Sequence, residues 1–491
     1  MRERFGKFIR NCDVEAVAAK LVIVSLVLLP VVEFFVSLLS KQFFLQEEIV
    51  EIFGLLSFAW VGVMMWRNKK IEIYLSDILL GMLFGLAIIS FIFSKDIMQS
   101  IFGHNYDYRE TILVVFSYYS VAVLTSRISN THYRKKILHT FFVLGIIETL
   151  VGILQFLGCW PFAPLFDPHT SARENAWGVQ EWAFGFTEHF NFFAALTVVF
   201  TALAAGRFLI CEGKRSVKYF LLAGFFFFGV MTTYTRIGWL GTIGFWCFLI
   251  LLYIVAKKIK KSRTELNIKK IMALLLLFGM IFAVSVMVFP ELQYNIFESV
   301  NEIQDENRDR MGNSRMKIWR EGLETVPEWW YAGTGFDNYI YSFYWDNPDY
   351  KGFTQSKGHN EYIHILVTQG VFALATLLTL IIYNLYTSSK RYLLSTVDEE
   401  ENKVTFTLLI MYAGYLCQAL ANSSVTNVAI YNWVITGLLL YVADKKVKWS
   451  LPIKERATGE EGKPVGAGSM VIRKFEIVMT AIIVIVAVFL T

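Results

Sequence analysis

Three basic side chains stand where apolar segments meet polar ones, and their types suit chemistry on a phosphate-linked group. Arg236 lies in TYTRIGWLG, Arg315 in NSRMKIWREGLET and His359 in KGHNEYIHILVTQG. Arginine stays charged at any working pH, and its planar guanidinium pairs two oxygens at once. A histidine at a helix N-terminus is disfavoured as a cation by the helix dipole, so it tends to stay neutral. Such a set could stabilise a departing diphosphate while the imidazole deprotonates an attacking hydroxyl.

Each of these residues also has an interpretation without a catalytic role. Arg236 could be an anchor that reaches from the membrane to the headgroups, Arg315 a solvated surface charge, and His359 a capping or interfacial residue. Within the apolar segments, Glu33 and Glu148 are the clearest ionisable residues, and a charge there points to function unless it lies near a helix end.

The elements that must position these side chains are membrane helices. Apolar residues make up 55% of the 491-residue chain and occur in runs long enough to cross a bilayer. The first run, 21–39, has no small-residue cleavage site behind it, so a secretory signal is not expected. The five cysteines lack disulfide or metal-ligand spacing. We expect an all-α integral membrane protein with about 12–13 transmembrane helices. The predicted spans are 19–40, 49–66, 73–93, 111–126, 137–158, 188–210, 217–235, 237–256, 268–289, 361–386, 403–421, 428–443 and 471–490.

Lysine and arginine recur in alternate loops, which predicts the orientation of the chain. The clusters lie in the N-terminal arm and at 67–70, 134–136, 214–218, 257–261, 390–391 and 445–448. We therefore expect a cytoplasmic N-terminus, and we interpret the net charge of +5 as a topology signal rather than a sign of nucleic-acid binding. Arg236, Arg315 and His359 then share the extracytoplasmic side.

The chain divides into a polytopic domain, 1–443, a flexible cytoplasmic linker, 444–470, and an additional C-terminal transmembrane helix, 471–491. A large extracytoplasmic loop region, 290–360, separates the ninth and tenth helices, and within it Asn313 or Ser314 can cap a helix that Pro327 ends. The aromatic residues of 329–353 suit either sugar recognition or contact with headgroups.

Several familiar signatures do not occur in the sequence. It has no P-loop, no G-x-G-x-x-G after a strand, no H-E-x-x-H, and no Asp-x-Asp of the sort that holds a metal and a nucleotide diphosphate. We therefore expect neither ATP-driven nor metal-dependent nucleotide-sugar chemistry, and no metal or cofactor.

In four stretches the chain resembles the O-antigen ligase and Wzy O-antigen polymerase superfamily of bacterial membrane glycosyltransferases. They cover a core region of about 185–375, and their order and spacing are more specific than any one of them. The stretches are GFTEHFNFFAAL (185–196), TYTRIGWLG (233–241), SRMKIWREGLETVPEWWYAGTGFDNY (314–339) and GHNEYIHILVTQGVFA (358–373).

The resemblance implies metal-independent transfer of a glycan from an undecaprenyl-diphosphate carrier to an acceptor hydroxyl, on the outer face of the bacterial cytoplasmic membrane. Arg236 and Arg315 match the family's diphosphate-binding arginines, His359 its proposed catalytic base, and Asn360 a supporting position. The implied partners are the lipid-linked donor, a glycan, lipid or protein acceptor, and membrane lipid. Capsular or O-antigen ligation and polymerisation both remain open.

The chain departs from the family at two places. Glu188 and His189 precede Asn191 where the family commonly has a small or neutral run, so these residues either pack or contact donor or acceptor. The span 471–490 exceeds the family's usual twelve helices. The main alternative function is a transporter or flippase of lipid-linked oligosaccharide, which predicts polar residues through the middle of several helices. The spans from 217 to 289 nearly lack them. A scaffolding protein would leave the large loop without a role.

Overall fold

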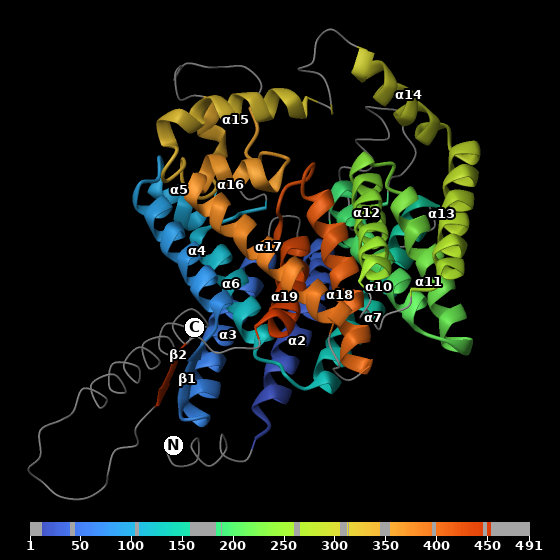
Figure 1. The fold of residues 1–491 in the computed structure, drawn as a ribbon. Helices are drawn as coiled ribbons and strands as arrows, with labels where there is room; N and C mark the ends of the chain where they lie inside the picture. The colour runs from blue at the N-terminus through green and yellow to red at the C-terminus, as the bar shows by residue number, and fades with distance from the viewer. Residues whose placement is uncertain are drawn as a thin grey trace, which may run out of the picture.

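The protein folds into a bundle of helices with a smaller group of helices at one end (Figure 1). The computed structural model describes residues 12–39, 45–103, 108–157, 183–187, 189–259, 266–304, 312, 314–343, 354–394, 399–444 and 449–452. The predicted span 471–490 and most of the predicted linker lie outside these residues.

Nine helices of the described chain are long and apolar enough to cross a membrane, which confirms the predicted all-α integral membrane fold. They are α2 (Val14–Leu39), α3 (Gln46–Arg67), α4 (Leu75–Ile92), α7 (Thr131–Phe156), α10 (Phe190–Ile210), α12 (Arg236–Lys258), α13 (Ile268–Val288), α17 (Val371–Leu394) and α19 (Thr426–Ala443).

Three more of the predicted spans form helices that pack inside the same bundle. They are α6 (Ile112–Ser126), α11 (Gly213–Met231) and α18 (Glu399–Gln418). The first packs on α3 and α19, the second on α10, and the third on α10 and α12. α6 has only 15 residues, and α11 and α18 carry charged residues in their first turns. By length and composition alone, nine helices of the described residues qualify as membrane spans, and these three do not.

The centre of the bundle is formed by α10 and α19, which are almost entirely buried. Small residues allow this, because they let helix backbones approach closely. A Cβ added at Gly206 of α10 would lie 3.2 Å from the Cα of Thr407, and one at Gly437 of α19 would lie 2.4 Å from the carbonyl oxygen of Ala122. By contrast, α13 lies at the periphery with most of its surface exposed.

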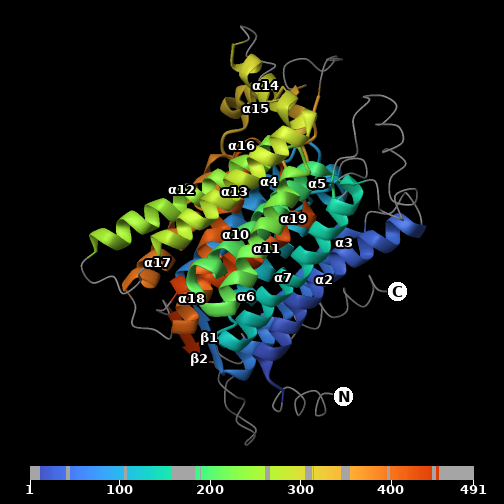
Figure 2. The same ribbon diagram turned by 90° about the vertical axis from the view of Figure 1, so that its right-hand side faces the viewer.

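Short helices gather at one end of the bundle, as Figures 1 and 2 both show. They are α5 (Ile97–Phe102), α14 (Pro290–Gln304), α15 (Arg315–Trp329), the 3₁₀ helix η2 (Tyr339–Phe343) and α16 (Glu361–Gln369). The predicted helix after Ser314 is present as α15, but Pro327 lies inside it rather than ending it, and Ser314 makes no side-chain capping bond.

A two-stranded antiparallel ladder lies at the other end of the bundle (Figure 1). Strand β1 (Lys70–Ile73) pairs with β2 (Trp449–Pro452), with Ile71 opposite Leu451. Since β2 falls within the segment that we expected to be a flexible linker, residues 449–452 of that segment are ordered against the bundle.

The predicted single span 361–386 is wrong, because the chain breaks into α16 and α17 at Gly370. Gly370 has a φ of 86°, a conformation that glycine adopts without strain. The carbonyls that the break frees are satisfied by the 333–335 segment: the amides of Thr334 and Gly335 donate to Val367 and Thr368. This arrangement turns α16 into a short helix of the end group, with His359 and Asn360 at its start.

Candidate active site

Residues with a left-handed backbone conformation lie at or within two positions of each predicted site residue. Six non-glycine residues of the described chain have a positive φ, and three of them are Tyr234 (54°), Ser314 (65°) and His359 (47°). The first two lie just before Arg236 and Arg315. Such conformations cost about 1–3 kcal/mol each and persist only where surrounding contacts hold them, which is common at functional sites.

Arg236 is the first residue of α12. The side chain of Thr235 caps this helix by accepting a hydrogen bond from the Gly238 amide. Its guanidinium makes a two-point contact with Glu302 of α14, with Nη1–Oε2 and Nη2–Oε1 distances of 2.5 and 3.3 Å. Glu298 lies 3.7 Å from the same group. In this structure two carboxylates therefore contact the Arg236 guanidinium, which we predicted to bind a diphosphate.

Arg315 lies at the start of α15, where its Nη1 donates to the carbonyl of Gly312 at 3.1 Å. Its Nε is buried, and no group of the described chain bonds to it. Burial lowers the pKa of Arg315, the positive charge of Arg236 lowers it further, and Glu302 opposes them. The two guanidinium groups are thus close enough to interact. A bound anion would accept a hydrogen bond from the Arg315 Nε and reduce the repulsion between Arg315 and Arg236.

His359 lies in the turn before α16, not in the helix itself, since Asn360 is the N-cap. Burial lowers the pKa of His359 to about 4, helped by the charge of Arg315 and by His364. The imidazole is therefore neutral near pH 7, as predicted, although burial rather than the helix dipole is the main cause. Within the described chain no hydrogen bond to this ring occurs.

The structure thus brings Arg236, Arg315 and His359 to one end of the bundle. The charge of Arg236 lowers the pKa of Arg315, and the charge of Arg315 lowers the pKa of His359. They come from three separate helical elements, α12, α15 and the turn before α16.

The predicted supporting residues have structural contacts. Asn360 accepts the amides of Tyr362 and Ile363 and donates to the carbonyl of Leu420 at 2.8 Å, so it fixes the start of α16. His189 caps α10 by accepting the Asn191 amide at 3.0 Å. Glu188 lies outside the described residues.

Of the two acidic residues predicted within apolar spans, Glu148 on α7 has a local structural role. It is buried and accepts the amide of Phe186 at 3.0 Å, which holds the segment leading into α10. The side chain of Glu33 lies outside what the structure describes.

A buried cluster that sequence reasoning missed lies directly behind His359. Lys357 contacts Asp337 at 3.0 Å and Glu110 at 3.5 Å, and Glu110 contacts Nε2 of His364 at 3.2 Å. All four side chains are buried. Two of them were visible in the sequence, because Lys357 and His364 belong to the same KGHNEYIH stretch as His359. Glu110 is far away in the chain and had no local signal.

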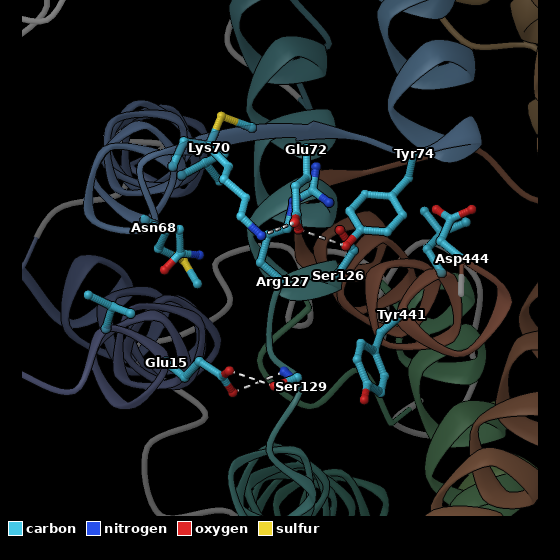
Figure 3. A pocket seen from close by; sticks show the side chains of 15 residues that line it. Glu15, Asn68, Lys70, Glu72, Tyr74, Ser126, Arg127, Ser129, Tyr441 and Asp444 are labelled. Carbon is cyan, nitrogen blue, oxygen red and sulfur yellow. Dashed lines mark hydrogen bonds and ion pairs between the residues drawn. The ribbon is translucent and has the colours of Figure 1, made fainter. Parts of the chain in front are cut away.

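A cavity of about 260 Å³ lies beside the β1–β2 ladder (Figure 3). The ladder is at the opposite end of the bundle from the short helices (Figure 1). Its charged residues are paired within the protein: Lys70 lies 3.8 Å from Glu72, and Glu15 accepts the Ser129 amide at 3.0 Å. None of the predicted site residues lines it. This cavity is therefore separate from the candidate active site.

Fold and site together describe a multi-pass membrane protein with a cationic site and a neutral histidine at one end of its helices. A family model described as O-antigen ligase matches residues 221–378, from within α11 to within α17. The matched region contains Arg236, Arg315 and His359. It also contains three of the four stretches that carry the resemblance, and the fourth, 185–196, precedes it. The match confirms the resemblance to this family. It assigns this region to the membrane glycosyltransferases of the O-antigen ligase and polymerase type. No curated protein matches the chain significantly.

Proposed function

We propose that this protein transfers a glycan from an undecaprenyl-diphosphate carrier to an acceptor hydroxyl, at the extracytoplasmic face of the bacterial cytoplasmic membrane, as a ligase or a polymerase. One observation carries the proposal: Arg236, Arg315 and the neutral His359 interact electrostatically inside the region that matches the O-antigen ligase model.

In the proposed reaction His359 takes the proton of the acceptor hydroxyl, and the resulting oxygen attacks the anomeric carbon of the donor sugar. The bond between that carbon and the phosphate oxygen breaks, and undecaprenyl diphosphate leaves. Arg236 and Arg315 would hold the leaving diphosphate, whose charge rises as the bond breaks. No metal is needed in this scheme, because the two guanidinium groups supply the positive charge.

The contacts of both His364 ring nitrogens favour His359 as the base. Both ring nitrogens of His364 are occupied, Nδ1 by the Gly358 amide at 3.3 Å and Nε2 by Glu110 at 3.2 Å. A base must be free to take a proton from the substrate within hydrogen-bond reach. His359 meets this requirement and His364 does not.

A reconstituted assay with lipid-linked oligosaccharide tests the proposal against the transporter alternative. In proteoliposomes that contain donor and acceptor, the wild-type chain should form the transferred glycan and release undecaprenyl diphosphate in equal amounts. A flippase would instead move the donor between leaflets when no acceptor is present, and would release no undecaprenyl diphosphate. That second pattern would reject the proposed function.

The low pKa of His359 predicts an unusual tolerance of acid. A base acts in its neutral form, and a histidine with a pKa of about 4 stays neutral above that pH, whereas one at the ordinary 6.5 would already be mostly protonated at pH 5.5. We expect kcat/KM, which reports the free enzyme, to stay flat from pH 7 to about 5 and to fall only toward 4. Recovery of activity after return to pH 7 controls for unfolding. A midpoint near 6.5 would contradict the assignment.

Glu302 is expected to compete with the donor, because it occupies the Arg236 fork in this structure. Partly exposed ion pairs contribute up to about 1 kcal/mol, so Glu302→Gln should lower the donor KM by roughly two- to fivefold at unchanged kcat. The matched control is Glu324→Gln, which removes an exposed contact 3.7 Å from Arg320 and should leave KM unchanged. A higher donor KM in the Glu302 variant would show that Glu302 assists binding instead.

A further inference from the structure

The backbone on both sides of His359 is held by hydrogen bonds, while the imidazole itself has no described hydrogen bond. The Gly358 amide donates to Nδ1 of His364 at 3.3 Å. The Gly358 carbonyl accepts from Nε1 of Trp319 at 3.0 Å. On the other side of His359, the Glu361 amide donates to the carbonyl of Ala419 at 2.9 Å.

The contacts to Gly358 explain how a strained residue persists. His359 has a φ of 47°, a left-handed conformation that a non-glycine residue adopts only where its surroundings enforce it. Gly358 also packs so closely that an added Cβ would lie 2.9 Å from the ring of Tyr339. The turn therefore has little freedom to relax, and its shape sets where the His359 ring lies.

The contacts of His364 orient its ring. Nδ1 accepts the Gly358 amide hydrogen, and Nε2 lies 3.2 Å from the Glu110 carboxylate. Tyr339 stacks on the ring at a centroid distance of 5.4 Å and an interplanar angle of 17°. His364 thus connects Glu110, which precedes α6, to the Gly358 amide, which precedes α16.

Lys357 keeps Glu110 ionised, and so maintains a strong acceptor for His364. Burial opposes the charge of Glu110, but Lys357 and His364 together hold its pKa below the ordinary value. Burial also opposes the charge of Lys357, and Asp337 and Glu110 outweigh it, which raises the pKa of the ammonium group. In a buried, low-dielectric setting such a fully paired network is rigid.

We propose that His364 is a positioning residue for this enzyme: its ring, oriented by Glu110, holds the Gly358 N–H, the indole of Trp319 holds the Gly358 carbonyl, and together they aim the His359 imidazole at the acceptor hydroxyl. The inference rests on the proposed function, in which His359 is the base. It differs from that function because it assigns a task to two residues that do not contact the substrate.

The first test separates the two hydrogen bonds of His364. His364→Ala removes both, whereas His364→Asn keeps an oxygen near the Nδ1 position that can still accept the Gly358 amide. Misplacement of a catalytic group by about 1 Å can cost about a hundredfold in rate. In full-length protein assayed with lipid-linked oligosaccharide extracted from native membranes, we expect the alanine variant to lose roughly ten- to a hundredfold in kcat at unchanged donor KM. The asparagine variant should recover part of the loss.

The second test uses Trp319→Phe, which removes one hydrogen bond without changing any charge and remains informative if the alanine variant fails to fold. The matched control is Trp330→Phe, at the exposed end of α15. Selective ¹⁵N-histidine labelling of the full chain gives a readout that needs no donor. The His359 signal, assigned by its absence in His359→Gln, should titrate near pH 4 in the wild type. In the Trp319 variant it should titrate at least one pH unit higher, because a freer ring is better solvated and lies farther from Arg315.

The outcomes separate this inference from the proposed function. Normal kcat and an unshifted His359 titration in both the His364→Ala and Trp319→Phe variants, with an inactive His359→Ala, would overturn the positioning role alone. Full activity of His359→Ala would overturn the proposed function, and the positioning role with it. Reduced kcat in the two variants, with the shifted titration and the partial rescue by asparagine, would support it.

Discussion

Replacing His359 with alanine is expected to reduce kcat by about 10²- to 10⁴-fold, the range that a general base contributes. The imidazole has no described hydrogen-bond partner, and its pKa of about 4 keeps it unprotonated near pH 7. Because the group acts on the acceptor hydroxyl rather than on the diphosphate, the donor should still bind. The expected result is a fall in kcat with nearly unchanged affinity for undecaprenyl diphosphate, measured by competition against the lipid-linked donor.

The control for this variant is His132→Ala, which removes an exposed histidine from the first turn of α7. It should be as active as the wild type. Normal transfer by the His359→Ala protein would show that another group takes the proton. Loss of donor binding in that variant would show instead that His359 contacts the donor.

Replacing Arg315 is expected to have the second large effect. Its Nε is buried without a described partner, and its charge is disfavoured both by burial and by Arg236. A buried donor that lacks a partner is costly, so the free protein holds Arg315 in a state that a bound diphosphate would improve. Removing one donor that stabilises a developing oxyanion costs about 10²- to 10³-fold in kcat, and we expect Arg315→Ala to lose that amount.

Lysine at position 315 should not replace the function of the arginine, since an ammonium group cannot pair two oxygens at once. We expect Arg315→Lys to remain impaired by at least tenfold, with both kcat and the affinity for undecaprenyl diphosphate reduced. Arg320→Ala on the same helix is the matched control, because that guanidinium is exposed and forms ion pairs within α15, 3.5 Å from Glu321 and 3.7 Å from Glu324. A fully active lysine variant would mean that charge alone suffices, and that the two-point contact is not used.

The break at Gly370 shows where reasoning from hydropathy fails. The segment 361–386 has the composition of one membrane helix, and nothing local in it reports that the amides of Thr334 and Gly335 will bond to its carbonyls. Only the folded chain brings these segments together. The same limit applies to Glu110, which lies 247 positions before Lys357 in the sequence.

The sequence by itself determined the class of protein, most of its helices and the three residues of the candidate site. Long apolar runs specify membrane helices because the bilayer has a fixed thickness. Arg236, Arg315 and His359 could be selected because the basic loops place them on one side of the membrane and because their stretches resemble those of the O-antigen ligase family.

Only the tertiary structure decided how these residues are arranged and what surrounds them. It shows that Glu302 contacts the guanidinium of Arg236 and that burial is the main cause of the low pKa of His359. It also shows that His364 accepts from the Gly358 N–H and that Trp319 donates to the Gly358 carbonyl. Each of these depends on contacts between distant parts of the chain. Burial and charge proximity are properties of such contacts, so no local pattern of residue types contains them.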